Sequence, residues 1–200
     1  MDPRRPLIGT VADLAALVLA APARLGGVRL VSVDGPAGSG KTTFAGRLAD
    51  ALGADSELVH LEDLYAGWTL TGATSRLSAG VLRPLSEGRC GAYHRYDWAA
   101  GRFAAEPTVV PVPRVLVVEG CGSSPRSLDA WTTLRVWVEA PAPLRLSRGL
   151  ARDGEDLAAH WRRWQETEAA HFAAEGTRAR ADVRVDGAAA APAGALVLLD

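Results

Sequence analysis

The sequence predicts an α/β fold in which helices flank a mainly parallel sheet of five strands. Short apolar runs rich in valine alternate along the chain with helical stretches, and strands separated by helices usually pair in parallel. One of these runs, 115–118, is apolar throughout, as strands buried on both faces are. The chain has 200 residues, of which 48% are hydrophobic, and no internal repeat or linker divides it. We therefore expect a single domain over residues 1–200.

The expected elements are placed by hydrophobic periodicity, glycines and prolines. In order, they are a helix at about 10–20, a strand from about 28, a helix at 43–52 stopped by Gly53, a strand at 57–61, a helix at 75–85 ended by Pro84, an aromatic- and proline-rich excursion at 90–112, strands at 115–120 and 134–138, helices at about 143–152 and 155–174, a strand at 182–185, and an Ala/Pro-rich tail. Along the long helix, Leu157, Trp161, Trp164 and Phe172 form one apolar stripe.

Composition excludes several classes of protein. The net charge of −1 gives no reason to expect nucleic acid or a membrane surface as a partner. Cys90 and Cys121 have neither metal-ligand nor disulfide spacing, and no apolar run is long enough to cross a membrane. A cytoplasmic protein is therefore expected. The basic residues are 21 arginines and a single lysine, Lys41, out of 22 in all, which suggests that Lys41 occupies a place where a guanidinium would not fit.

Lys41 belongs to a phosphate-binding loop. The short β-branched run at 29–33 is predicted to be a buried strand. It leads into a segment that matches G-x-x-x-x-G-K-[ST] without a mismatch, and helical sequence follows. In such a P-loop the backbone amides cradle phosphates, the lysine reaches the β- and γ-phosphates, and the threonine hydroxyl ligates Mg²⁺. The nucleotide-binding residues expected are Gly35, Pro36, Ala37, Gly38, Ser39, Gly40, Lys41, Thr42 and Thr43.

An acidic partner for the loop follows a second buried strand. Residues 115–118 are all apolar, and Glu119 comes directly after them. Because ligands bind at the carboxyl ends of parallel strands, Glu119 is expected beside Thr42, with the two holding Mg²⁺. A carboxylate that only caps a turn is the alternative.

The loop does not identify the phosphate acceptor, but the sequence narrows the choice. Regulatory GTPases need an Asn/Thr-Lys-x-Asp element that reads guanine. The chain has no asparagine and no second lysine, so it lacks this element and is not expected to be a regulatory GTPase. Large motor ATPases need a longer chain. A small-molecule kinase requires only the loop, a base, an acceptor pocket and a closing lid, and fits this length.

Four segments resemble the uridine kinase branch of P-loop kinases, which includes phosphoribulokinase-like and pantothenate kinase-like proteins. They are the loop at 34–43, Glu62-Asp63-Leu64-Tyr65 (similar to Asp-x-[Phe/Tyr]-Tyr), Tyr96-Asp97-Trp98 (similar to Tyr-Asp-Phe), and Arg148-x-x-x-Arg152-Asp153. The resemblance spans about residues 28–186. It implies a P-loop NTPase fold and phosphate transfer from ATP, with Mg²⁺, to a nucleoside-like small molecule. It also implies an acceptor region at about 62–112 and a lid at about 148–156.

The resemblance assigns roles to individual residues. It implies Glu62 as the general base, at a position where the family has aspartate, although the adjacent Asp63 could serve instead. It places Tyr65, Tyr96 and Asp97 at the acceptor, and Arg148 and Arg152 over the transferring phosphates. For the two arginines a solvated helix face is the alternative, and the aromatic residues could simply pack.

Two other functions remain open at this point. The chain could phosphorylate a different acceptor, such as a pantothenate-like molecule or a sugar alcohol. It could also be an accessory protein that hydrolyses ATP slowly and needs no acceptor base. A homo-oligomer is possible.

Overall fold

A central sheet of five parallel strands organises the computed structural model, which describes residues 9–189 and 194–200. The strand order is β2-β7-β1-β8-β9, and every pairing is parallel. The strands are β1 (Arg29–Asp34), β2 (Ser56–His60), β7 (Val115–Glu119), β8 (Thr132–Glu139) and β9 (Val183–Asp186). The predicted α/β fold with a five-stranded parallel sheet is confirmed.

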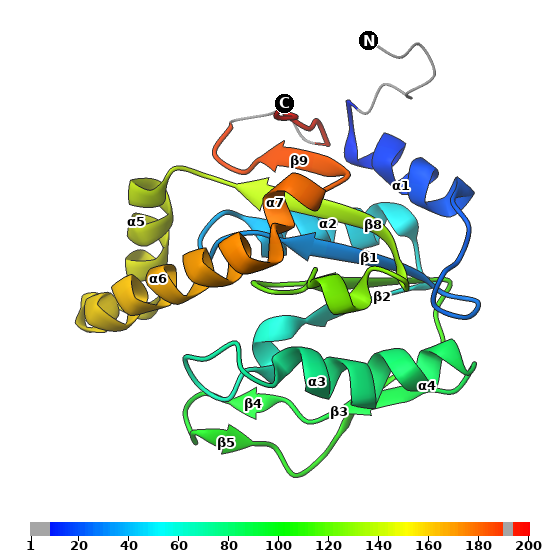
Figure 1. Ribbon diagram of the computed structural model, residues 1–200, viewed down its shortest axis with the longest axis horizontal. Helices are drawn as coiled ribbons and strands as arrows, with labels where there is room; N and C mark the ends of the chain where they lie inside the picture. The colour runs from blue at the N-terminus through cyan, green and yellow to red at the C-terminus, as the bar shows by residue number, and fades with distance from the viewer. Residues whose placement is uncertain (1–8, 190–193) are drawn as a thin grey trace.

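Helices cover both faces of this sheet (Figure 1). On one face, α1 (Val11–Ala20) and α2 (Lys41–Leu52) pack with Val31, Val117 and their neighbours. On the other face, Leu30, Leu116 and Val118 pack against the helical segment 73–86 and against Trp164 of α6 (Ala158–Glu175). The two apolar clusters bury alternate residues of the same strands, which is why β7 is apolar from Val115 to Val118.

The helical segment at 73–86 continues past the proline that was expected to end it. It consists of α3 (Ala73–Leu77), a π-helical turn (Ser78–Leu82) and α4 (Arg83–Ser86). In a regular α-helix the ring of Pro84 would clash with the carbonyl of residue 80 and would leave it without a donor. The wider turn that precedes the proline relieves this conflict.

Two small antiparallel pairs form the excursion between the helical segment and β7. Strand β3 (Gly91–Tyr93) pairs with β6 (Thr108–Val110), and β4 (Tyr96–Asp97) pairs with β5 (Arg102–Phe103). In Figure 1 this excursion lies beneath α3 and α4, on the side of them away from the central sheet.

The remaining helices follow β8. They are α5 (Ala142–Asp153), a 3₁₀ turn (Glu155–Leu157), α6 and α7 (Thr177–Arg180). The lid expected at about 148–156 therefore comprises the last turns of α5, Gly154 and the start of the 3₁₀ turn. Within the part of the chain that the structure describes, no helix is long and apolar enough to cross a membrane.

Candidate active site

The predicted P-loop links the end of β1 to the start of α2, and neighbouring backbone packs tightly against its glycines. Gly38 and Gly40 have φ of +77° and +96°, which disfavour any other residue type. A Cβ on Gly38 would lie 2.5 Å from the carbonyl oxygen of Arg145 in α5. A side chain at Gly38 would therefore push α5 away from the loop, which explains why glycine is needed here.

Lys41 lies at the base of this loop with its side chain buried. Its Nζ donates to the carbonyl of Pro36 at 2.9 Å and lies 3.7 Å from Sγ of Cys121. Burial alone would lower the pKa of Lys41, but the carboxylates of Glu119, Glu168 and Asp34 raise it above its usual value. Lys41 therefore remains a cation that can face phosphate.

Thr42 and Glu119 meet as predicted for a magnesium site. The Thr42 hydroxyl donates to Oε1 of Glu119 at 3.2 Å, and Nδ1 of His60 lies 2.6 Å from the same oxygen. That hydrogen bond raises the pKa of His60. No group of three or more His, Cys, Asp or Glu residues suited to a metal ion occurs within residues 9–189 and 194–200. Hydroxyl and carboxylate oxygens suit Mg²⁺, which usually takes few protein ligands and completes its shell with water and phosphate.

The loop opens into a cleft of about 770 Å³. Lys41, Thr42 and Glu119 line one part of it, and Glu62, Arg148 and Arg152 line another. Five aromatic side chains complete the wall: Tyr65, Trp68, Trp98, Trp161 and Trp164. The cleft thus combines a phosphate-binding end with flat apolar surfaces on which a ring could stack.

The structure separates the two adjacent acids that the sequence left as alternatives. Both lie in a 3₁₀ turn after β2 (Leu61–Leu64). Glu62 lines the cleft, and the pKa of its carboxyl is raised by partial burial and by the nearby Glu119, against the opposing effect of Arg152. Asp63 is buried, accepts from the hydroxyl of Tyr93 at 3.2 Å and pairs with Arg95 at 3.1 Å. Only Glu62 of the two lines the cleft.

The two lid arginines stand at the rim of the cleft. Arg148 donates to the carbonyls of Gly38 and Gly187 at 3.2 and 3.1 Å. Arg152 pairs with Asp153 at 2.7 Å, and its guanidinium lies 5.8 Å from the ring centre of Trp161. Both side chains are exposed, so new partners in the cleft can replace their present ones at little cost.

The three residues expected at the acceptor lie in different surroundings. Tyr65 lines the cleft, and its buried hydroxyl donates to the carbonyl of Cys121 at 2.8 Å. Tyr96 and Asp97 are not among the described residues that line the cleft. Tyr96 packs edge-on against Trp98, which does line the cleft. Asp97 accepts from the backbone N–H groups of residues 99 and 100 and so stabilises a turn.

Comparison with known proteins identifies the fold. Neither a family model nor a curated protein matches the chain. Solved structures do match it, among them the following three. A protein described as a possible uridine kinase from Bacillus stearothermophilus has a TM-score of 0.64 at 19% identity, and the match covers 87% of this chain and 96% of that one. A protein from Silicibacter sp. TM1040, described as a fructose transport system kinase, has a TM-score of 0.59 at 23% identity, with 88% and 98% covered. The YGR205w protein has a TM-score of 0.57 at 11% identity, with 88% and 93% covered.

The chain has the P-loop NTPase fold. Its candidate site lies where this kind of sheet places ligands, at the carboxyl ends of neighbouring parallel strands. Strands β1, β7 and β2 end beside one another, with Glu119 in register with Val33 on one side and His60 on the other. The P-loop follows β1, Glu119 is the last residue of β7, and Glu62 lies two residues after the end of β2.

Three site residues were missed by the sequence analysis: Glu168, Arg145 and His60. Glu168 of α6 is 2% exposed, pairs with Arg145 at 2.8 Å and accepts from the P-loop N–H of Ala37 at 2.8 Å. A signal for Glu168 was present, because it lies four residues after Trp164 and four before Phe172, on the apolar stripe of the long helix. A carboxylate at a core position calls for a buried partner.

Asp34 connects the P-loop to the segment that follows Glu119. This fully buried carboxylate accepts from the backbone N–H groups of Gly35, Gly122 and Ser124 at 2.7–2.9 Å. Burial raises the pKa of Asp34 despite these donors. The bonds fasten the two loops that carry Lys41 and Glu119 to each other.

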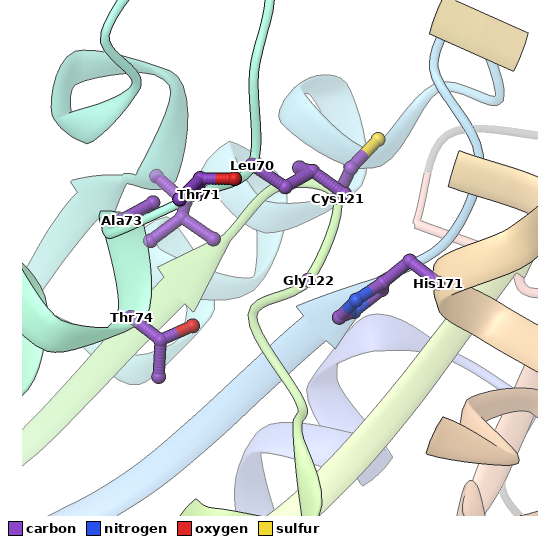
Figure 2. Close-up of a pocket in the computed structure, with 8 residues that line it drawn as sticks. Leu70, Thr71, Ala73, Thr74, Cys121, Gly122 and His171 are labelled. Atoms are coloured by element: carbon purple, nitrogen blue, oxygen red, sulfur yellow. The ribbon is translucent and has the colours of Figure 1, made fainter. Parts of the chain in front are cut away.

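A second cavity of about 200 Å³ lies beside the main cleft and shares Cys121 with it. Figure 2 shows the His171 ring directed at Gly122, with the Cys121 side chain turned away from it. Nε2 of His171 is buried and makes no protein hydrogen bond in the described part of the chain. Burial raises the pKa of Cys121 far above its usual value, so this cysteine remains a thiol and is not a nucleophile.

Proposed function

We propose that the chain is a kinase that uses ATP and Mg²⁺ to phosphorylate a hydroxyl group of a nucleoside-like small molecule. The observation that carries the proposal is that Lys41, Thr42, Glu119 and Glu62 line one cleft, whose remaining wall is aromatic. Binding of nucleotide alone would not require Glu62, because the loop and its magnesium pair already hold the phosphates.

Each residue has a defined task in this proposal. Lys41 and the amides of the P-loop hold the β- and γ-phosphates and stabilise the charge that develops on them. Thr42 and Glu119 would hold Mg²⁺, which supplies further neutralisation of phosphate charge when bound. Glu62 accepts the proton of the attacking acceptor hydroxyl. The pKa of its carboxyl is raised by burial and by the nearby Glu119, which makes it a stronger base than an ordinary glutamate.

Closure of the lid completes the site. Arg148 leaves the carbonyls of Gly38 and Gly187, Arg152 leaves Asp153, and both guanidinium groups turn to the phosphates. Charge-assisted bonds to phosphate are stronger than the bonds to neutral carbonyls that Arg148 gives up. Closure also excludes water, which would otherwise compete with the acceptor for the phosphoryl group.

The aromatic wall supports a nucleoside as the acceptor. Stacking of a base on an aromatic side chain contributes about 1–3 kcal/mol, and Trp68 and Trp98 stand in the same cleft as Glu62. A kinase whose acceptor is a linear alcohol would instead need polar side chains at these positions, to bind the hydroxyl groups of that acceptor.

The test is ADP release from ATP and Mg²⁺ in the presence of uridine, cytidine, pantothenate or fructose, supplied one at a time. We expect a nucleoside to stimulate ADP release well above the rate without acceptor, and mass spectrometry to find the nucleoside monophosphate. Stimulation by fructose or pantothenate alone would show that the acceptor is misassigned. ADP release that no acceptor changes would favour the accessory ATPase.

A further inference from the structure

Glu168 is a buried carboxylate whose position cannot be explained by helix packing alone. It lies on the apolar stripe of α6, where a leucine would pack without any cost of desolvating a charge. Its two oxygens are instead fully engaged. Oε1 accepts from Arg145 at 2.8 Å, and Oε2 accepts from the N–H of Ala37 at 2.8 Å and lies 3.3 Å from Sγ of Cys121.

Glu168 and Lys41 hold opposite ends of a single peptide unit. The carbonyl of Pro36 accepts from Nζ of Lys41 at 2.9 Å. The N–H of the same unit belongs to Ala37 and donates to Glu168. Because a trans peptide is planar, its C=O and N–H point in opposite directions. Fixing the N–H on Glu168 therefore aims the carbonyl at Lys41, and with it fixes where the ammonium group lies.

Arg145 orients the next peptide unit of the loop. The carbonyl of Ala37 accepts from its guanidinium at 3.4 Å, so the N–H of Gly38, in the same unit, points the opposite way. The backbone of Arg145 also packs directly on Gly38, since a Cβ there would lie 2.5 Å from the Arg145 carbonyl oxygen. The Glu168–Arg145 ion pair thus sets the direction of two successive peptides in the phosphate-binding loop.

We infer that Glu168, paired with Arg145, is a positioning residue that orients the Pro36–Ala37 peptide and thereby Lys41 for the β- and γ-phosphates. This inference rests on the proposed function, because it assigns Glu168 a role in binding the nucleotide. Glu168 does not touch the phosphates in this account. It acts from the opposite side of the loop, and it links α6, the helix that follows the lid, to the residues that bind nucleotide.

Two variants test the role of Glu168, and the second of them leaves no buried charge unpaired. Glu168→Gln keeps the shape of the side chain but offers one acceptor and one donor group, so it cannot accept from both Ala37 and Arg145. The double variant Arg145→Met, Glu168→Leu removes the ion pair, a change that stability often tolerates. Glu166→Gln, on an exposed position of the same helix, is the matched control. Melting temperature establishes that each variant is folded.

The decisive measurement compares the Kd for ATP with the Kd for AMP, which lacks the β- and γ-phosphates. We expect the Kd for ATP to rise and kcat to fall by ~10–100-fold in both test variants, as for a displacement of about 1 Å in a site. The Kd for AMP and the KM for the acceptor should not change, and Glu166→Gln should match the unmodified chain.

Three results would overturn the inference. If a folded test variant keeps its ATP affinity and kcat, Glu168 only stabilises the fold. The same conclusion follows if the variant loses ATP affinity and AMP affinity equally. Should the double variant fail to fold, Glu168→Gln decides by the same criteria. An unmodified chain that binds no ATP would instead refute the proposed function, and the inference with it.

Discussion

Replacing Glu62 by glutamine is expected to lower kcat by ~10²–10⁴, the range for loss of a general base. At about 1.36 kcal/mol per tenfold change, this corresponds to ~3–5 kcal/mol of lost transition-state stabilisation. The affinity for ATP should change little, since Glu62 lines the cleft but the P-loop and Lys41 hold the phosphates. The structure therefore predicts an effect on kcat and not on nucleotide binding.

Asp63→Asn is the matched comparison, because the two acids are adjacent but have different surroundings. Asp63 bonds to Tyr93 and Arg95 of the excursion. A hydrogen bond to a charged group contributes ~1.5–3 kcal/mol, and the pair with Arg95 contributes less because that side chain is 61% exposed. We expect Asp63→Asn to lower the melting temperature and to raise the KM for the acceptor, with a smaller loss in kcat than in Glu62→Gln.

Steady-state kinetics of both variants, with ATP binding measured separately, decides whether Glu62 or Asp63 is the general base. The pH profile gives a second criterion. The base must be ionised, and the pKa of Glu62 is raised from 4.5, so the acid limb of kcat/KM should lie above pH 4.5 and should be absent from the residual activity of Glu62→Gln. Greater loss of kcat in Asp63→Asn would refute the assignment. If neither substitution lowers kcat, the argument for an acceptor base fails.

Three further predictions concern the loop, the lid and the packing behind them. Lys41→Met should reduce kcat by ~10²–10³ in a folded protein; normal turnover would contradict the assignment of the P-loop. Backbone amides in residues 148–156 should exchange hydrogen more slowly with ATP and acceptor bound than without them, and unchanged exchange would argue against a lid. Gly149→Ala should destabilise the protein by ~1–3 kcal/mol, because its Cβ would lie 2.4 Å from the buried Trp161 ring. Gly46 lies in α2 with open space around it, so Gly46→Ala should instead raise the free energy of unfolding by up to ~1 kcal/mol through helix propensity. Equal urea midpoints for Gly149→Ala and Gly46→Ala would contradict this prediction.

The sequence by itself determined the sheet and its phosphate-binding edge. The P-loop motif is contiguous, so the chain bonds alone bring Gly35, Lys41 and Thr42 together. Strands buried on both faces are mostly apolar, which is why residues 115–118 and, less completely, residues 29–33 could be recognised as strands. Glu119 followed from a general property of such sheets, since side chains after neighbouring strands meet at one edge.

Tertiary structure alone decided which side chains share the cleft and which support it from outside. Adjacent acids such as Glu62 and Asp63 look equivalent in sequence, but packing of the excursion gives Asp63 two partners and leaves Glu62 in the cleft. Tyr96 and Asp97 match a family pattern, yet their strand places them behind Trp98 or in a turn. Glu168 reaches Ala37 across 131 positions of the chain. Contacts at such separations depend on how whole helices pack on the sheet, and no local pattern of residue types records that.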